Sequence, residues 1–427
     1  MGRLERRYWA AEVAGIGVPR RDRAGGKYEA YIPDKLVGRR FMLDGDVAAD
    51  VADATAAITR LDVEAQALTN TESLARLLLR AESVASSHIE GLRVSPQRLL
   101  RADMARAEGV AVNDETASEV LANVDAMSYA VHDDIDPITV DRILEVHRRL
   151  LVHSNKARYA GVIRTEQNWI GGSDFNPLHA AFVPPPPRAV RSLLKDLATF
   201  CNDEQLPAVA QAAIAHAQFE TIHPFADGNG RTGRALIYMV LRRRGLAKRV
   251  TPPVSLTLAT RARDYVRGLD ATRYVGRASA PAATDAMNHW IAFFAAACTR
   301  AVADAESFER RVQELQAQWR ARLGEVRSDS SAFVLLQRLP EMPVLTVTAA
   351  TNALGRTFRA VNRAIENLVE AKVLTPVKAG QRNRVFEARE LLDAFTALER
   401  QLASPDGNPR TSRPARPVPA RPKPRRK

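Results

Sequence analysis

The chain has only two cysteines among its 427 residues, Cys201 and Cys298. They stand far apart in apolar stretches that we expect to be helical, so we interpret them as buried thiols. A disulfide-dense scaffold is therefore excluded, and a reducing compartment is favoured. No apolar run reaches the length of a membrane-spanning helix, and the first residues lack the apolar region of a signal peptide. We therefore expect a cytoplasmic protein without membrane contact.

Acidic residues are outnumbered: 49 Asp and Glu stand against 62 Lys and Arg, which gives a net charge of +13. The imbalance is uneven, because the stretch from Gly407 onward holds eight basic residues and no acid. This Pro/Arg-rich stretch cannot bury a core, so we expect residues 401–427 to be a disordered basic tail. Such a tail either attracts nucleic acid and acidic surfaces without specificity or only keeps the protein in solution.

The most informative stretch is HPFADGNGRTGR, residues 223–234. The proline that follows His223 disfavours the α conformation there, so we expect an incoming helix to end at this histidine. The glycines on both sides of Asn229 predict a tight turn whose N–H groups point inward. A second helix should follow, with its N-terminus facing the turn. A glycine turn that leads into a helix N-terminus is a typical anion site.

The polar side chains of this stretch suit phosphate chemistry. Asp227 provides a hard oxygen ligand for Mg²⁺. Arg231 and Arg234 are three positions apart, so they share one helix face and can both bind phosphates. His223 has a pKa suited to deprotonating an attacking hydroxyl near neutral pH. A histidine before proline is usually structural on its own, so the prediction depends on all these residues occurring together.

This stretch resembles the signature of the Fic family, His-x-Phe-x-Asp/Glu-Gly-Asn-Gly-Arg-x-x-Arg, and matches it at every position. Such proteins mostly transfer AMP from ATP to a hydroxyl side chain of a target protein. The Doc-like kinase branch of the family carries lysine where this chain has Gly230, which favours nucleotidyl transfer. The resemblance implies a base at His223, a Mg²⁺ ligand at Asp227, a core anchor at Phe225, an anion hole at Gly228, Asn229 and Gly230, and phosphate contacts at Arg231 and Arg234.

A second stretch, SSHIEG at residues 86–91, closes a helix that we expect to begin near residues 69–71. Glu90 lies in its last turn, where an acidic side chain opposes the helix dipole. A solvated surface glutamate is the alternative. The stretch is similar to the inhibitory helix of many Fic proteins, Ser/Thr-x-x-x-Glu-Gly/Asn, which Ser86, Glu90 and Gly91 match. The resemblance implies that Glu90 pairs with Arg234 and prevents productive placement of the γ-phosphate.

Two further segments resemble parts of the family. Gly171 and Gly172 predict a hairpin or extended flap, which the prolines at 184–187 would end. The family has such a flap beside its active site, where target segments dock as an added strand. Residues 256–269 are similar to the segment near the family's adenine pocket, which implies a nucleotide contact for Tyr265. A core tyrosine is the alternative.

The pattern changes after residue 330. Two short helices lead to a turn at Gly355, and a helix over 357–371 should bury Phe358, Val361, Ile365 and Leu368. Two short strands around a basic turn follow. This order resembles a winged helix-turn-helix, whose outer face would carry Arg356, Arg359, Asn362 and Arg363. Winged helices bind DNA or protein partners, and both interpretations stay open.

We therefore expect a mainly α protein: a Fic-type helical core with a small β-hairpin flap, plus a C-terminal winged helix. The expected units are an N-terminal arm and helical region with the inhibitory helix (1–115), the catalytic core (116–300), a connecting helix (301–330), the winged helix-turn-helix (331–400) and the tail (401–427).

The leading hypothesis for function is an autoinhibited, Mg²⁺-dependent protein adenylyltransferase. Its partners would be ATP and a target protein, or the chain itself, with an exposed Tyr, Ser or Thr hydroxyl. The alternatives are a DNA-binding regulator with a nucleotide-sensing Fic domain and an enzyme that removes AMP. A homodimer is compatible with the sequence.

Overall fold

The computed structural model describes residues 1–11, 19, 22–66, 71–107, 109–132, 137–377 and 384–402. The described chain is mainly helical and contains one two-stranded and one three-stranded antiparallel sheet. The mainly α fold class expected from the sequence is therefore confirmed. Within these residues, none of the helices combines the length and hydrophobicity that crossing a membrane requires.

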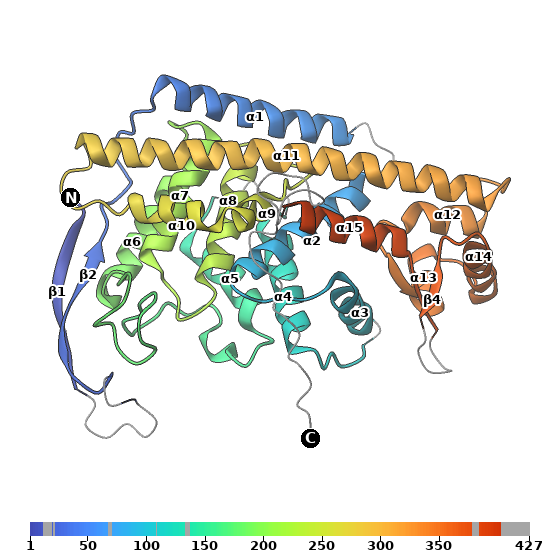
Figure 1. The fold of residues 1–427 in the computed structure, drawn as a ribbon, viewed down its shortest axis with the longest axis horizontal. Coiled ribbons are helices and arrows are strands. Elements are labelled where there is room, and N and C mark those ends of the chain that lie inside the picture. Colours follow the sequence, from blue (N-terminus) through green and yellow to red (C-terminus); the bar gives the residue numbers. More distant parts are fainter. Residues whose placement is uncertain are drawn as a thin grey trace, which may run out of the picture.

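The chain begins with a β-hairpin that projects from one end of the molecule (Figure 1). Strand β1 (Arg3–Trp9) pairs antiparallel with β2 (Gly26–Ile32). The Tyr31 N–H continues this pairing by donating to the Val183 carbonyl oxygen at 2.9 Å. The hairpin is thus hydrogen-bonded to the segment that is expected to form the flap. Trp9 packs edge-on against Trp169, with 5.4 Å between ring centroids.

Helix α7 (Ala208–Ile222) lies at the centre of the core, and every one of its residues is buried. Alanine at six of its positions lets neighbouring helices approach closely, and a helix that is buried on every side belongs in the interior. The surrounding helices are α2 (Thr71–Ile89), α3 (Pro96–Ala107), α4 (Glu115–Ala130), α5 (Val140–Leu151), the 3₁₀ helix η2 (Ala157–Tyr159), α6 (Pro187–Cys201), α8 (Asn229–Arg243), α9 (Val254–Thr260) and α10 (Ala262–Ala271).

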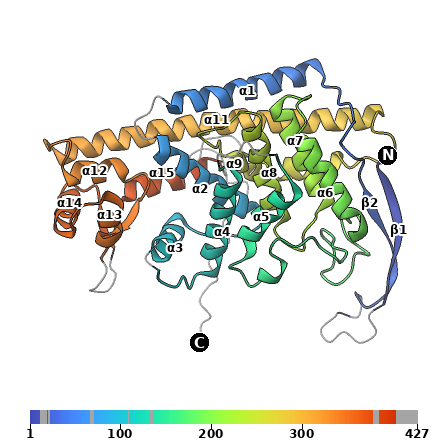
Figure 2. The same ribbon diagram turned by 180° about the vertical axis from the view of Figure 1, so that it is seen from behind.

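Two long helices lie side by side across one face of this core (Figures 1 and 2). Helix α1 (Gly45–Gln66) packs on the first half of α11 (Pro281–Leu323). Helix α11 continues without a break past residue 300, the expected end of the catalytic core. The helix that closes the core is therefore also the connection to the C-terminal unit.

The C-terminal unit is formed by residues 331–377 and 384–402. Its sheet has the strand order β3-β5-β4, so the last strand in sequence lies in the middle. Gly355 ends the second helix in the left-handed conformation, with φ of 62°. The elements are α12 (Ser331–Arg338), β3 (Val344–Thr346), α13 (Val347–Leu354), α14 (Phe358–Glu370), β4 (Thr375–Val377), β5 (Val385–Glu387) and α15 (Arg389–Leu402).

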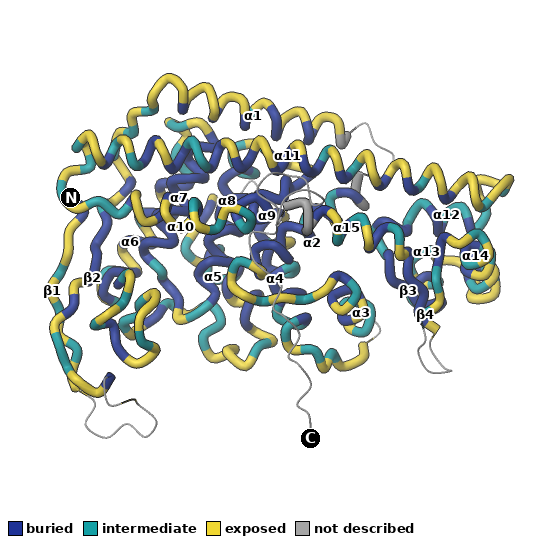
Figure 3. Tube along the Cα trace, viewed as in Figure 1, coloured by how far each residue is buried: buried dark blue, intermediate teal, exposed yellow. Residues whose placement is uncertain are grey.

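Burial along α14 follows the expected stripe with one exception (Figure 3). Val361, Ile365 and Leu368 are buried, but Phe358 is 58% exposed. Phe358 is the first residue of the helix, directly after the N-cap Thr357, and the buried positions of α14 begin only one turn later, at Val361. The prediction that Phe358 faces inward is wrong.

Helix α3 joins the C-terminal unit to the N-terminal helices. Leu99 and Ala102 pack towards α2 and α4, whereas Leu100 packs on the C-terminal sheet. Arg101 donates to Glu387 of β5 at 2.8 Å, and that carboxylate is almost completely buried. The two faces of one short helix thus contact two parts of the molecule.

Candidate active site

The turn between α7 and α8 has the backbone that its sequence predicts. Helix α7 ends at Ile222, and His223 adopts the left-handed conformation with φ of 48°. Its N–H still donates to the Phe219 carbonyl at 2.9 Å, which closes the helix. Gly228, with φ of 77°, is the N-cap of α8. The N-terminus of α8 therefore faces the inside of the turn, where it favours an anion.

The interior of the turn is fixed by an amide and an aromatic ring. The Asn229 side chain accepts from the Phe225 N–H at 2.9 Å and donates to the Phe225 carbonyl at 2.8 Å. The Phe225 ring is fully buried and stacks on His147, with 3.7 Å between centroids and 4° between planes. The side chain of Asn229 therefore shapes the loop, which leaves only its backbone for an anion.

His147 supports the loop from α5. Burial lowers the pKa of its imidazole to about 4, so the ring is neutral near pH 7. Its Nδ1 accepts from the Gly161 N–H at 3.1 Å, so the ring proton is on Nε2, which donates to the Asp227 carbonyl at 2.9 Å. Together with Asn229, His147 binds the outward-facing carbonyls of the turn.

His223 itself is kept in the state that a general base needs. Burial is the main cause that lowers the pKa of its imidazole to about 4, and the guanidinium of Arg164 lowers it further. The imidazole is therefore neutral at physiological pH and can accept a proton from a hydroxyl.

Arg231 carries hydrogen-bond donors that lack acceptors. Its side chain is only 4% exposed, yet Nε and Nη1 have no hydrogen-bond partner among the described residues. The nearest carboxylate oxygens, of Asp227 and Glu119, lie at 3.8 and 3.9 Å. Buried charged donors without an acceptor are costly, so this guanidinium fits an anionic ligand such as a phosphate.

Arg234 is held by the end of helix α2. Its Nη2 donates to Glu90 Oε1 at 2.8 Å and to the Ser86 carbonyl at 2.7 Å, and its Nε donates to the Ser86 hydroxyl at 2.8 Å. Burial is the largest single influence and lowers the pKa of Arg234, but Glu90, Tyr265 and Glu220 together outweigh it and raise the pKa overall. The Arg234 side chain is 1% exposed and that of Glu90 37%.

The Glu90 carboxylate also fills the glycine turn. A Cβ placed on Gly230 would meet Glu90 Oε1 at 2.0 Å, so only glycine leaves room for the carboxylate at this position. An anionic group therefore already lies at the N-terminus of α8, between the turn and Arg234. Gly91 ends α2 with φ of 86°, which turns the chain away directly after Glu90.

Helix α2 is fixed to its neighbours by buried polar contacts. The Asn123 amide of α4 donates to the Ser83 carbonyl at 2.8 Å and to the Ser87 hydroxyl at 3.0 Å. Glu82 accepts from the N–H of Ser255 at 2.7 Å and from its hydroxyl. Burial raises the pKa of Glu82 to about 7. These contacts place the Glu90 end of α2 over the turn.

Asp227 offers one ionised carboxylate to a metal. Burial raises its pKa, but hydrogen bonding and charge from Lys156 outweigh this and lower it overall. Lys156 forms an ion pair with Oδ2, so a cation is already stabilised at that oxygen. No group of three His, Cys, Asp or Glu suited to a metal occurs in the described chain. The residues therefore fit Mg²⁺ bound through a single carboxylate and substrate phosphates.

The expected flap is extended but barely paired. Ile170 and Phe182 form an isolated bridge in which the Ile170 N–H donates to the Phe182 carbonyl at 2.8 Å. No strand is formed in residues 161–186, so the expected β-hairpin is reduced to this bridge. Positive φ at both Gly171 and Gly172, 72° and 78°, takes the chain out of the extended conformation directly after the bridged Ile170, so the pairing does not continue there.

Tyr265 lies in the core behind the site. Its side chain is 4% exposed, and its hydroxyl lies 2.8 Å from Nε2 of His216. Its ring packs near Trp290, with 6.1 Å between centroids. These contacts match the core alternative better than a nucleotide contact.

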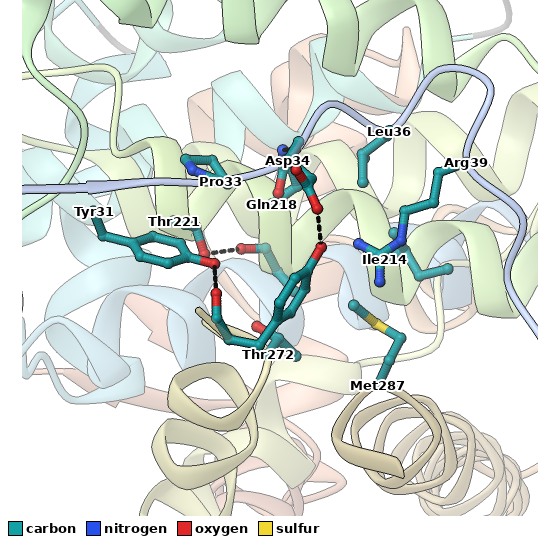
Figure 4. A pocket seen from close by; sticks show the side chains of 12 residues that line it. Tyr31, Pro33, Asp34, Leu36, Arg39, Ile214, Gln218, Thr221, Thr272 and Met287 are labelled. Atoms are coloured by element: carbon teal, nitrogen blue, oxygen red, sulfur yellow. Dashed lines mark hydrogen bonds between the residues drawn. The ribbon is translucent and has the colours of Figure 1, made fainter. Parts of the chain in front are cut away.

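A small pocket beside α7 carries no ligand site. Tyr31, Asp34 and Gln218 line it (Figure 4). The Tyr31 hydroxyl donates to the Tyr274 carbonyl at 2.6 Å, and the amide of Gln218 donates to the Asp34 carbonyl at 2.8 Å. The space between these side chains is about 10 Å³, about enough for one water molecule.

Comparison with known proteins identifies the turn and its surroundings. Residues 137–241 match the profile of the Fic/DOC family, and residues 48–132 match that of the Fic/DOC family N-terminal region. The chain contains a Fic domain. The first of these regions covers α5, α6, α7, the turn and most of α8, and the second covers α2 with Glu90.

Relatives of this Fic domain carry an enzymatic name. The protein adenylyltransferase fic-1 of Caenorhabditis elegans is 40% identical over 133 residues, which are 30% of this chain and 23% of that protein. The protein adenylyltransferase Fic of Culex quinquefasciatus is 32% identical over 222 residues, which are 48% of this chain and 41% of that protein. The chain thus spans less than half the length of these relatives.

A solved structure has a similar fold. A Fic family protein from Desulfovibrio desulfuricans G20 superposes with a TM-score of 0.50 at 22% identity, over 82% of this chain and 97% of that one. At this identity the likeness concerns the fold alone.

The sequence patterns pointed to residues within the turn of the Fic domain. They did not predict the residues of other segments that contact this turn. The structure brings His223, Asp227, Arg231, Arg234 and Glu90 together, as expected. His147, Lys156, Arg164 and Asn168 were not predicted. A histidine within the buried stripe of α5 was the available signal for His147. Arg164 and Asn168 contact backbone carbonyls, for which the sequence gives no signal.

Proposed function

We propose that the protein is an adenylyltransferase that transfers AMP from ATP to a hydroxyl side chain of a target protein or of the chain itself. The observation that carries the proposal is the arrangement of Arg231 and Arg234 around the glycine turn. One guanidinium has unpaired buried donors, and the other binds a carboxylate that lies against Gly230. This is a site for several adjacent anionic groups, as a polyphosphate provides.

The residues of the turn have separate roles in this reaction. The backbone N–H groups of Asn229 and Gly230 face the phosphates, joined by that of Gly228 once it leaves Asp227 Oδ1, and Arg231 and Arg234 neutralise their charge. The neutral His223 accepts the proton of the attacking hydroxyl as its oxygen bonds to the α-phosphorus. Pyrophosphate leaves as the bond between the α-phosphorus and its bridging oxygen breaks. Two adjacent arginines suit a leaving group with this charge.

Asp227 would hold Mg²⁺. The bound metal would neutralise charge on the phosphate oxygens. For this, the Lys156 ammonium has to leave Oδ2, and its 47% exposure gives it room to move.

We further propose that Glu90 inhibits the enzyme. Its carboxylate takes the donor of Arg234 that the γ-phosphate needs and lies against the turn where phosphates would bind. Phosphates can then enter only in an arrangement that leaves the α-phosphorus out of line with the hydroxyl. Displacement by about one ångström can cost roughly a hundredfold in rate.

Incubation with ATP labelled separately at the α- and γ-phosphates tests the proposed reaction. Label transferred to protein from the α position indicates AMP transfer. Label from the γ position alone indicates a kinase. Because the wild-type protein is inhibited, the Glu90→Gly variant is assayed in parallel. Absence of transfer from both proteins with a set of candidate targets would leave a nucleotide sensor as the better interpretation.

A second function is favoured for the C-terminal unit. We propose that residues 331–377 and 384–402 belong to a winged helix that binds DNA, because α14 exposes Arg359 and Arg363 on one face, and Arg356 is exposed just before the N-cap of this helix. Arg384, at the start of β5, donates to Asn362 at 3.2 Å and extends this basic face. Retention of the full chain on a DNA column at low salt, lost steeply as salt rises, tests this function. Lack of retention at low salt favours a protein partner.

A further inference from the structure

We propose that Arg164 is a positioning residue for the reaction: it holds His223 in its left-handed backbone and keeps the imidazole directed at the attacking hydroxyl. The inference rests on the adenylyltransferase activity proposed above. It assigns a role to a residue outside the turn, on the segment that leads from η2 to the flap.

Arg164 binds the carbonyls of the strained turn in succession. Its Nε donates to the His223 carbonyl at 2.8 Å, and its main-chain N–H donates to the Pro224 carbonyl at 3.0 Å. Its Nη2 lies 3.4 Å from the Ile222 carbonyl. A non-glycine residue at φ of 48° is unfavourable on its own, so the surroundings have to stabilise it. These contacts do so directly at the histidine.

The same guanidinium fixes the turn to the flap. Nη1 donates to the Glu166 carbonyl at 3.0 Å and Nη2 to the Pro185 carbonyl at 2.5 Å. All of these side-chain hydrogen bonds go to carbonyl oxygens, although Arg164 is 6% exposed. A buried cation without a carboxylate partner is costly, and here the carbonyl oxygens that accept from it, including those at the negative end of α7, offset that cost. Burial accordingly lowers the pKa of Arg164 to about 10.

Arg164 acts on His223 through its charge as well as through its hydrogen bonds. The charged groups that face the imidazole are Arg164 and Arg273, which disfavour its protonation, and Glu90, which favours it. Glu220, one turn earlier on α7, is buried, and its pKa is raised to about 7. Burial of the ring is the largest influence, and Arg164 is the second. Loss of Arg164 should therefore let the ring turn and raise its pKa.

Three variants separate the positioning of His223 by Arg164 from the effect of the Arg164 charge on the imidazole. Arg164→Met removes the side-chain hydrogen bonds and the charge at similar volume, and Arg164→Lys keeps the charge but loses the forked geometry. Arg244→Met is the matched control. Arg244 also donates to a carbonyl, that of Leu206 at 2.8 Å, but at the opposite end of α7. Each is made in the full chain carrying Glu90→Gly, and its folding is checked by thermal melting.

The measurements are kcat and KM for ATP in AMP transfer, and the pKa of His223 by NMR. Arg164→Met should lower kcat by about ten- to a hundredfold with KM unchanged, and should raise the imidazole pKa. Arg164→Lys should keep the pKa low and recover part of kcat. Arg244→Met should change neither. A folded Arg164→Met protein with unchanged kcat and unchanged pKa would overturn the proposal, as would a rise of the pKa in Arg164→Lys equal to that in Arg164→Met.

Asn168→Ala provides a second test if Arg164→Met does not fold. The Asn168 amide donates to the same His223 carbonyl at 3.3 Å and to the Phe225 carbonyl at 3.0 Å, but carries no charge. It should lower kcat without moving the pKa of His223, and a change in KM alone would count against positioning. The NMR pKa requires no turnover. If no variant transfers AMP, the proposed function fails, and the pKa comparison still tests the link between Arg164 and His223.

Discussion

Two regions of the molecule carry clusters of arginine, and the surroundings of their guanidinium groups differ. At the turn between α7 and α8, Arg231 and Arg234 are 4% and 1% exposed. On α14 of the C-terminal unit, Arg359 and Arg363 are exposed to water. A buried guanidinium has to be compensated by specific neighbours, so the structure reveals what it binds or lacks. An exposed guanidinium is solvated by water, so the structure does not indicate what it binds. Its ligand has to be found by experiment.

The largest effect expected in the catalytic turn is the loss of its base. His223→Ala should lower AMP transfer by about a hundred- to ten-thousandfold, because no other group takes the hydroxyl proton. ATP binding should persist, since both buried arginines remain. Transfer of α-label and ATP affinity are measured on the same protein. Near-normal labelling by His223→Ala would mean that the base is another group.

The pH dependence of the same reaction sharpens this assignment. The base is active when neutral, and the pKa of His223 is lowered to about 4. Activity should therefore stay constant as pH falls through 6.5 and decline only as it approaches 4. The kcat/KM of the Glu90→Gly protein is measured across this range, with ATP binding followed separately. An acid limb near 6.5 would show that the imidazole is not shielded as the structure indicates.

Releasing the buried arginine should have the next largest effect, in the opposite direction. Glu90→Gly should raise transfer by up to about a hundredfold, because Arg234 becomes available to the γ-phosphate. Arg234→Ala breaks the same ion pair but removes the phosphate contact, so it should not activate. Label incorporation is compared for both single variants and the double variant. Equal activation by the two single variants would exclude inhibition through this pair.

A smaller effect is expected at Asp227. Asp227→Asn should raise the Mg²⁺ concentration required for transfer by about tenfold or more, because a neutral amide is a poorer ligand for this ion. Lys156→Met should lower the requirement, since the competing ammonium is removed. Titration of activity with Mg²⁺, together with Mn²⁺ binding in the presence of ATP, measures both changes. Full activity of the wild type in excess chelator would exclude the metal.

The exposed arginines should show the smallest effects. If the C-terminal unit binds DNA, Arg359→Ala and Arg363→Ala should each weaken binding only a few-fold, and each lost phosphate contact should lower the salt slope by about one. Arg267→Ala on α10 is the control, because Arg267 is as exposed but lies outside the C-terminal unit. Equal losses from all three variants would indicate nonspecific attraction.

The sequence predicted those features that depend on local chemistry. The end of α7 at His223 followed from the proline after it and is confirmed, and Gly355 ends α13 as expected. The residues of the turn were selected because several rare constraints coincide in one short stretch, and their roles stay predictions. Phe358 was misplaced, because periodicity gives the face of a helix but not the turn at which burial begins.

The residues that hold the turn from outside could not be predicted. Arg164 and His147 act through carbonyl oxygens of residues some 60 to 80 positions away. Every residue has such an oxygen, so the sequence gives no sign of which pairs meet. The pairing of Glu90 with Arg234 came from resemblance to a family, since the sequence alone allowed a solvated glutamate equally well.

The space at Gly230 has a thermodynamic consequence. A carboxylate and a phosphate cannot occupy it together, because even a Cβ would lie 2.0 Å from Glu90 Oε1. ATP affinity and the order of the last turn of α2 are therefore linked, and the linkage is reciprocal. A contact that stabilises the last turn of α2 therefore lowers the affinity for ATP by some factor. Bound ATP destabilises that turn by the same factor. Proteolysis or hydrogen exchange near Gly91 should thus report how much of the protein holds ATP.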